Sequence, residues 1–109
     1  MKKIYQKNNV TIRLTDERWA HIVKEHCELA GMRLEILETV SCPLRILAGN
    51  DSELLSVREL SPVTNLVVVY REFEDDGFII TAFITSKTKS LNRRNQILLY
   101  YLSYFTSIL

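Results

Sequence analysis

Both histidines of this 109-residue chain, His21 and His26, lie in a stretch that predicts a short helix over residues 15–26. Thr15 is expected to cap its start, and acidic residues follow where backbone N–H groups lack partners. An apolar stripe recurs at helical spacing and consists of Trp19, Ile22, Val23 and His26. Because histidines five positions apart diverge by about 140° around a helix, we expect one of the two to pack and the other to be free to titrate.

A second set of polar side chains is expected on one face of a β-sheet. Alternation predicts that Ile80 and its apolar neighbours at residues 78, 82 and 84 meet the helices, as do Leu55 and Val57. The strand over residues 65–73 is apolar on both sides, so we expect it to be central. The face opposite the helices is then expected to carry a polar cluster, formed by Arg58, Thr81, Thr85, Lys87 and either Tyr70 or Arg71.

These residue types suit cleavage of a phosphodiester bond by the neighbouring 2′-OH. One group must accept the 2′-OH proton, another must protonate the leaving 5′-oxygen, and cations must stabilise the charge on phosphorus; neither a metal nor a cofactor is required. A histidine can perform either proton transfer, and Arg58 or Arg71 can hold a phosphate through paired hydrogen bonds. The polar face and the helix lie on opposite sides of the sheet unless His21 sits at its edge.

The elements that would position these side chains follow from the hydrophobic period. A short strand is expected at residues 10–14 and a second helix at residues 32–40, which Pro43 ends. The period then changes to two, and four strands are expected at residues 44–48, 54–60, 65–73 and 78–87. The pair Asp76-Gly77 is the strongest hairpin signal. We predict an α+β fold in which the short strand and two helices pack on one face of a four-stranded antiparallel sheet.

Composition is that of an ordinary globular domain, with 47% apolar and 25% charged residues. The net charge is +1, but the charges are unevenly distributed along the chain. Residues 10–85 carry seven basic and thirteen acidic side chains, a net of −6. Basic ends on an acidic body fit a phosphate-bearing partner or solvated termini. Two cysteines, Cys27 and Cys42, are too few for a disulfide framework, and the histidine spacing does not suit zinc, so we predict a cytoplasmic protein without a metal site.

Residues 97–109 are almost entirely apolar or aromatic and predict a helical tail after a single domain over residues 1–96. Thirteen helical residues span roughly 20 Å, less than the roughly 30 Å of a bilayer core, so we predict no membrane span. The tail is expected to cover the open sheet face, to pair with a second copy of the chain as a homodimer, or to bind a partner protein.

Four stretches together resemble a known family, the barnase/EndoU/colicin/RelE-like (BECR) small nucleases of phage and bacterial toxin-type domains. The stretches are Ile12-Arg-Leu-Thr-Asp-Glu-Arg-Trp-Ala-His-Ile-Val-Lys-Glu-His26, Ile36-Leu-Glu-Thr-Val-Ser-Cys-Pro43, Leu66-Val-Val-Val-Tyr70 and Gly77-Phe-Ile-Ile-Thr-Ala-Phe-Ile-Thr85. The resemblance implies N-terminal helices followed by a four-stranded sheet, and active residues of three kinds: a helix histidine, a strand arginine and a strand threonine.

Two hypotheses follow. The first is a metal-independent endoribonuclease of toxin type that is controlled by an antitoxin protein. Its catalytic candidates are His21, His26, Arg58, Thr81 and Thr85, and its candidates for RNA binding are Tyr70, Arg71 and Lys87. The second is a non-catalytic interaction module of the same fold that dimerises or docks through residues 97–109. The acidic body favours the second hypothesis, because RNA-cutting domains more often carry a positive excess.

Overall fold

The computed structural model describes residues 2–5, 10–74 and 76–96, and the predicted apolar tail over residues 97–109 lies outside these ranges. The chain begins with two antiparallel strands, β1 (Lys2–Tyr5) and β2 (Thr11–Leu14). The strand β2 was expected from its alternating sequence. The strand β1 was not, because lysines near the start of a chain fit a solvated basic terminus equally well.

The two predicted helices are confirmed. The first, α1 (Asp16–Glu25), is capped by Thr15, whose Oγ1 accepts a hydrogen bond from the Arg18 backbone N at 3.1 Å. A 3₁₀ turn (Cys27–Leu29) leads to the second, α2 (Arg33–Ser41). Within the described residues, no helix combines the length and the apolarity needed to cross a membrane.

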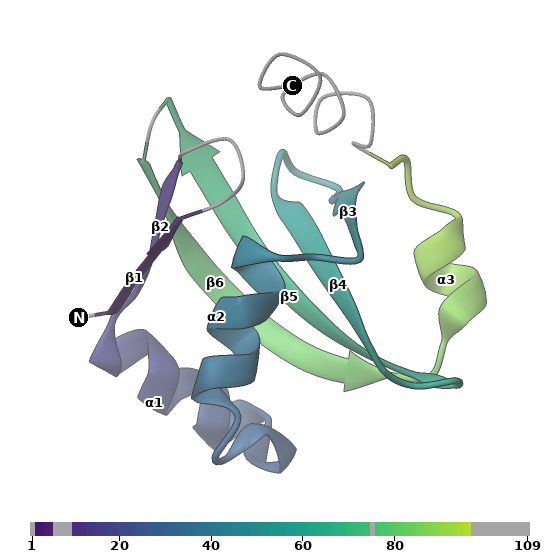
Figure 1. Cartoon of the computed structure of the whole chain (residues 1–109), viewed down its shortest axis with the longest axis horizontal. Coiled ribbons are helices and arrows are strands. Elements are labelled where there is room, and N and C mark those ends of the chain that lie inside the picture. Colours follow the sequence, from purple (N-terminus) through teal and green to yellow (C-terminus); the bar gives the residue numbers. More distant parts are fainter. Residues whose placement is uncertain (1, 6–9, 75, 97–109) are drawn as a thin grey trace.

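The second half of the chain forms an antiparallel meander, as expected. It consists of β3 (Arg45–Ala48), β4 (Leu54–Ser61), β5 (Thr64–Phe73) and β6 (Asp76–Thr85), and it ends in the short helix α3 (Thr88–Asn92) (Figure 1). Each of these strands pairs with the next one along the chain, and β5 lies between β4 and β6 as its two apolar faces predict.

The fold is α+β, but the prediction of a four-stranded antiparallel sheet is wrong. The sheet has six strands in the order β1-β2-β6-β5-β4-β3, and β2 pairs with β6 in parallel. This pairing joins residues more than sixty positions apart, namely Ile12 with Gly77 and Arg13 with Phe78. Alternation within a strand predicts that a strand exists, but it carries no information about a partner so distant along the chain.

The turn of the β5–β6 hairpin also differs from the prediction. Phe73 pairs with Asp76, so the connection consists of residues 74 and 75, and Glu74 adopts a positive φ of 56°. Gly77 lies within β6 instead of in the turn. A Cβ at this position would collide with the Arg71 carbonyl oxygen and would lie 2.7 Å from Ile12 Cδ1. Glycine is therefore needed where β2 and β5 approach β6, and not for the turn.

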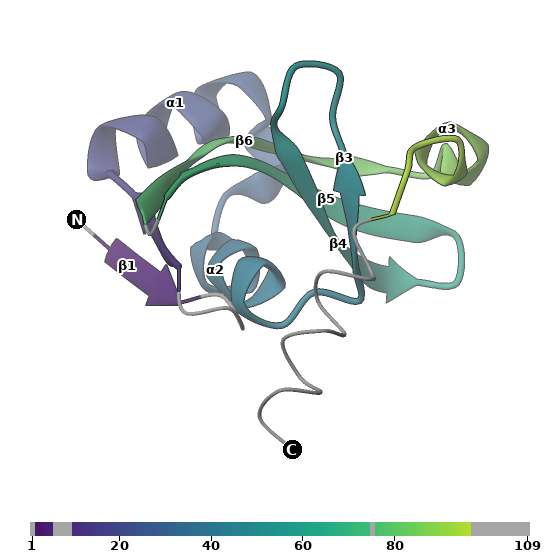
Figure 2. The ribbon, with the colours of Figure 1, turned by 90° about the horizontal axis from the view of Figure 1, so that it is seen from above.

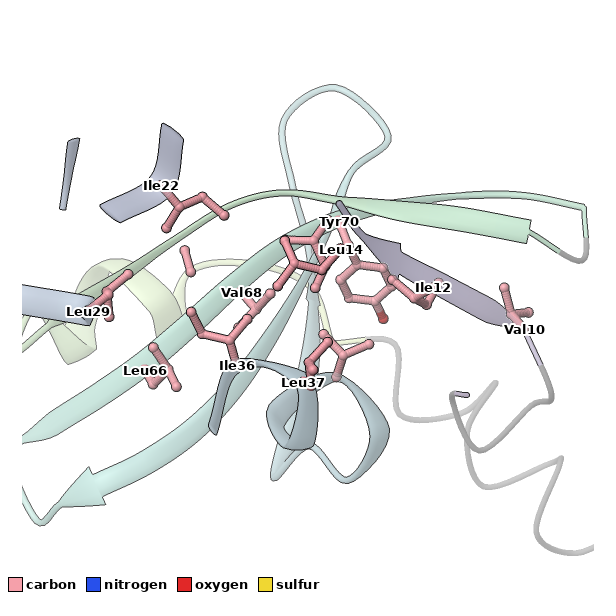
Figure 3. Close-up of a cluster of buried hydrophobic side chains, with 13 residues drawn as sticks. Val10, Ile12, Leu14, Ile22, Leu29, Ile36, Leu37, Leu66, Val68 and Tyr70 are labelled. Atoms are coloured by element: carbon pink, nitrogen blue, oxygen red, sulfur yellow. The ribbon is translucent and has the colours of Figure 1, made fainter. Parts of the chain in front are cut away.

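The face of the sheet that carries α1 and α2, here called the helix face, holds the larger core. Figure 2 shows the sheet curving around α2, and Figure 3 shows Tyr70 among side chains from β2 and α2. The buried residues of this core are Val10, Ile12, Leu14, Ile22, Leu29, Ile36, Leu37, Val40, Leu66, Val68, Tyr70, Ile79 and Ala82. Burial of this apolar surface is the main force that holds the helices on the sheet.

The opposite face, here called the α3 face, is covered in part by a second cluster. Leu91 of α3 packs there against residues of three strands, namely Leu47, Leu55, Val57 and Val67. The expectation that Leu55 and Val57 meet the helices α1 and α2 is therefore wrong. Both faces of β4 are covered, so the apolar residues of this strand do not identify which face the helices occupy.

A bulge reverses the alternation in β6. Val69 pairs with Thr81 and Tyr70 pairs with Ile79, so the register skips Ile80. After the bulge, Ala82 and Ile84 contact the helix-face core as predicted. Before it the prediction is wrong, because Ile79 is buried there while Phe78 is 41% exposed on the α3 face. One extra residue in a strand exchanges its two faces.

Candidate functional site

His26 lies where α1 ends, and its backbone N donates a hydrogen bond to the Ile22 carbonyl oxygen at 2.8 Å. The strand β2 pairs with β6 only as far as Phe78, and α1 lies beside the remainder of β6 (Figure 2). The end of α1 is therefore brought to the edge of the sheet rather than to the middle of one face. The edge position required of a catalytic histidine is occupied by His26 and not by His21.

A pocket of about 450 Å³ opens at this edge, between the end of α1, the end of β6 and α3. It is called the β6-end groove below. Its lining combines polar and charged groups with an apolar floor and consists of His26, Glu28, Leu55, Phe83, Ile84, Thr85, Lys87, Ser90, Leu91 and Arg94. Three of the predicted site residues, His26, Thr85 and Lys87, thus meet in one place.

Local hydrogen bonds hold the polar part of the groove. Thr85 Oγ1 accepts a hydrogen bond from the Lys87 backbone N at 3.0 Å, which fixes the chain as it leaves β6. The Arg94 Nη1 atom donates to the Ala48 carbonyl oxygen at 3.3 Å and to Asn50 Oδ1 at 3.0 Å. These partners are neutral, so the positive charge of Arg94 is not balanced by them.

The imidazole of His26 is partly exposed, with 32% of its side chain accessible, and its Nδ1 lies 3.7 Å from Glu28 Oε1. This contact leaves Nε2 as the ring nitrogen directed away from the carboxylate. Among the described residues that line the groove, Glu28 is the one carboxylate. The groove therefore holds two groups that can exchange a proton, together with two cations and two hydroxyl groups.

His21 lies on a different side of α1. Its side chain is 53% exposed and contacts the Glu25 carboxylate, one helical turn further along. It does not line the groove. As predicted, the two histidines have separate environments. The histidine that shares a pocket with other candidate residues is His26, which belongs to the predicted apolar stripe.

Arg58 lies on the helix face, which contradicts its predicted place in an open polar cluster. Its Nη1 contacts Glu38 Oε2 of α2 at 3.1 Å, and its side chain lines a separate pocket with Ser41, Cys42 and Leu44. The reason is again that both faces of β4 are covered by apolar clusters. Alternation in this strand therefore does not predict which face a side chain points to. Arg58 and His26 therefore do not share a site.

Tyr70 is completely buried in the helix-face core, with 0% of its surface exposed. Such burial is incompatible with the predicted contact to a substrate. Its neighbour Arg71 occupies the α3 face, where it forms ion pairs with Asp51 at 3.1 Å and Glu53 at 3.7 Å. Arg71 is thus the member of the pair that points away from the helices.

Arg71 and Thr81 nevertheless lie far from the groove along the sheet. Arg71 pairs with Phe78, seven positions before Thr85 in β6. At about 3.3 Å per residue this separation is about 23 Å, and Thr81 is about 13 Å from Thr85. The six candidates for the predicted polar cluster are therefore spread over two faces and both ends of the sheet.

Glu28 and Arg94 were missed as site residues. Arg94 belongs to the basic run after β6, which was noticed only as a charge pattern. Glu28 lies in the 3₁₀ turn, where no period marks an orientation. Both cysteines are exposed. Within residues 10–74 and 76–96, no three His, Cys, Asp or Glu side chains form a cluster suited to a metal ion.

Comparison of the chain with protein-family models, with curated proteins and with solved structures finds no match. The interpretation of the groove therefore depends on its own residues.

Proposed function

We propose that this chain is a metal-independent endoribonuclease of toxin type whose active site is the β6-end groove. The observation that carries the proposal is the meeting of His26, Glu28, Thr85, Lys87 and Arg94 in one pocket, from segments far apart in the sequence. These groups provide proton transfer and positive charge, which are the two requirements for cleavage of an RNA phosphodiester bond.

In the proposed reaction, the Glu28 carboxylate accepts the proton of the 2′-OH while the 2′-oxygen forms a bond to phosphorus. The bond from phosphorus to the 5′-oxygen breaks, and protonated His26 donates a proton to that oxygen. The products are a 2′,3′-cyclic phosphate and a free 5′-OH. Lys87 and Arg94 stabilise the negative charge on the phosphoryl oxygens, and the Thr85 hydroxyl orients the phosphate.

The likeness to the BECR nucleases supports this proposal in two ways. It implies that a helix histidine and a strand threonine act together. His26 and Thr85 are such a pair, and both line the β6-end groove. The order of two helices followed by a four-stranded meander also agrees with that family's pattern. Membership of the family, a cytoplasmic location and control by an antitoxin belong to the same proposal.

The experiment compares two matched variants. Purified wild type, His26→Gln and His21→Gln are incubated with single-stranded RNA, and cell growth is followed when each is expressed. We expect wild type and His21→Gln to cleave RNA and arrest growth, and His26→Gln to lose at least a hundredfold in cleavage rate. Intact RNA with the wild type, or equal activity of the two variants, would reject the proposal.

A non-catalytic interaction module is the second candidate. The observation in its favour is Glu28, because a carboxylate beside His26 opposes the approach of a phosphate, and the body of the chain is acidic. In this case residues 97–109 would dimerise or dock. Harmless expression of the wild type, together with a dimer that requires these residues, would favour this candidate.

A further inference from the structure

The segment after β6 has an unusual electrostatic environment. Residues 86–96 carry four basic side chains and no acidic one. Lys87, Lys89 and Arg93 form no ion pair within the described part of the chain. Lys89 and Arg93 are also exposed to solvent. Their charges therefore remain available to an external anion.

Elsewhere in the described chain, most arginines have a carboxylate partner. The ion pairs are Arg13–Asp76, Arg33–Asp16, Arg58–Glu38 and Arg71–Asp51. Four of the six arginines over residues 10–85 are thus paired with carboxylates, whereas the described cations after β6 are not. A strongly charged segment without compensation within the chain is typical of a surface that meets a partner of opposite charge.

This segment also has a concave shape. A pocket of about 560 Å³ is lined by cations and hydroxyl groups, namely Ser86, Lys87, Thr88, Lys89, Ser90 and Arg93. Ammonium, guanidinium and hydroxyl groups are the side-chain donors that commonly bind phosphate oxygens. We call this hollow the basic pocket.

The basic pocket adjoins the β6-end groove, because Lys87 and Ser90 line both. A single small anion would occupy one of the two hollows. A ligand whose negative charges repeat along its length can occupy both at once. The backbone of a nucleic acid has this property, since each nucleotide adds one phosphate.

We propose that the basic pocket binds backbone phosphates of single-stranded nucleic acid next to the nucleotide held in the β6-end groove. Its role in RNA cleavage rests on the proposed function, but the binding itself does not. Lys89 and Arg93 contact phosphates without reading bases, so the pocket holds the strand in position and confers no sequence preference.

The test uses the full-length chain and oligo-deoxythymidine, which has no 2′-OH and cannot be cleaved by the proposed chemistry. The double variant Lys89→Gln/Arg93→Gln is compared with Arg18→Gln/Lys24→Gln, which removes the same charge from exposed positions of α1. Loss of two phosphate contacts should weaken binding by roughly tenfold to thirtyfold at about 0.1 M salt and reduce the salt dependence, d log K/d log[salt], by about 1.4. The α1 variant should bind like the wild type.

Equal affinity of the two double variants, or no binding of the oligonucleotide to the wild type, would overturn the inference. Oligoglutamate of the same length is a third arm, and binding as tight as that of DNA would assign the surface to an acidic protein instead. Binding that depends on Lys89 and Arg93 in a protein that leaves RNA intact would retain the pocket and reject the nuclease. RNA cleavage with an unchanged KM in Lys89→Gln/Arg93→Gln would retain the nuclease and reject the basic pocket as a binding site.

Discussion

At the residue scale, the function of a side chain in this protein depends on what the fold places around it. His21 and His26 lie on one short helical segment, yet one pairs with a carboxylate in solvent and the other lines a groove with two cations. Arg58 and Arg94 differ in the same way, since a carboxylate neutralises the first while the second contacts only neutral acceptors. The second member of each pair is the one suited to act on a phosphate.

The proposed proton transfers predict a large effect of replacing the base. Glu28→Gln should lower kcat/KM by roughly 10²- to 10⁴-fold, because the amide cannot accept the 2′-OH proton. Steady-state cleavage of RNA checks this, and a rate equal to that of the wild type would exclude Glu28 as the base.

Ser56 lies on the helix face opposite Val68, is 0% exposed, and its Oγ has no hydrogen-bond partner among the described residues. A buried hydroxyl without a partner loses its hydration and gains nothing in return. We expect Ser56→Ala to raise the free energy of unfolding by about 1 kcal/mol, measured by urea denaturation. Ser41→Ala is the control, because the Ser41 hydroxyl bonds the Glu38 carbonyl at the surface, and its effect should be small. Destabilisation by Ser56→Ala would show that the hydroxyl is satisfied in solution.

At the element scale, the parallel contact of β2 with β6 sets the site. This contact ends at Phe78, and the rest of β6 is then free to receive α1, whose C-terminal end brings His26 to the groove. The bulge at Ile80 has a second effect, since it returns Ala82 and Ile84 to the helix face and so determines the side on which Thr85 lies. Both features are properties of strand pairs and not of single strands.

Gly77 is the position on which this contact depends most. An alanine methyl would collide with the Arg71 carbonyl oxygen of β5 and press against Ile12 of β2. We expect Gly77→Ala to lower the free energy of unfolding by about 1–3 kcal/mol. Gly49→Ala is the comparison, because the three atoms nearest to its methyl belong to the Glu53 side chain and not to the backbone, so we expect a smaller loss of stability. Thermal denaturation of the two variants compares them, and equal midpoints would contradict the close approach of the three strands.

At the scale of the whole molecule, charge is divided along the chain. The described residues of the two buried clusters run from Val10 to Leu91. Negative charge is concentrated over residues 10–85, and the basic pocket lies beyond it. Where the basic pocket binds nucleic acid as proposed, the negative charge of residues 10–85 would repel a strand that approaches the body of the chain, and this favours one binding geometry.

The clusters formed by the described residues already join α1, α2 and α3 to the sheet, so we expect a chain that ends at Gln96 to fold. We expect its thermal midpoint to remain within a few degrees of the full-length value and, if residues 97–109 mediate self-association, its mass in solution to fall from dimer to monomer. Light scattering coupled to size-exclusion chromatography measures the mass, and circular dichroism measures the fold. A full-length chain that is already monomeric would exclude self-association through the tail, and loss of the fold would assign the tail to the core.

The sequence by itself determined the local elements. The helix cap at Thr15, both main helices and the four strands of the meander follow from side-chain preferences and hydrophobic period, which act over a few residues. It also identified His26, Thr85 and Lys87 among its candidates. The tertiary structure alone decided that β2 joins β6, that a bulge exchanges the faces of β6, and that Glu28 and Arg94 reach the same groove. Contacts between distant segments depend on how whole surfaces fit together, and no short pattern encodes them.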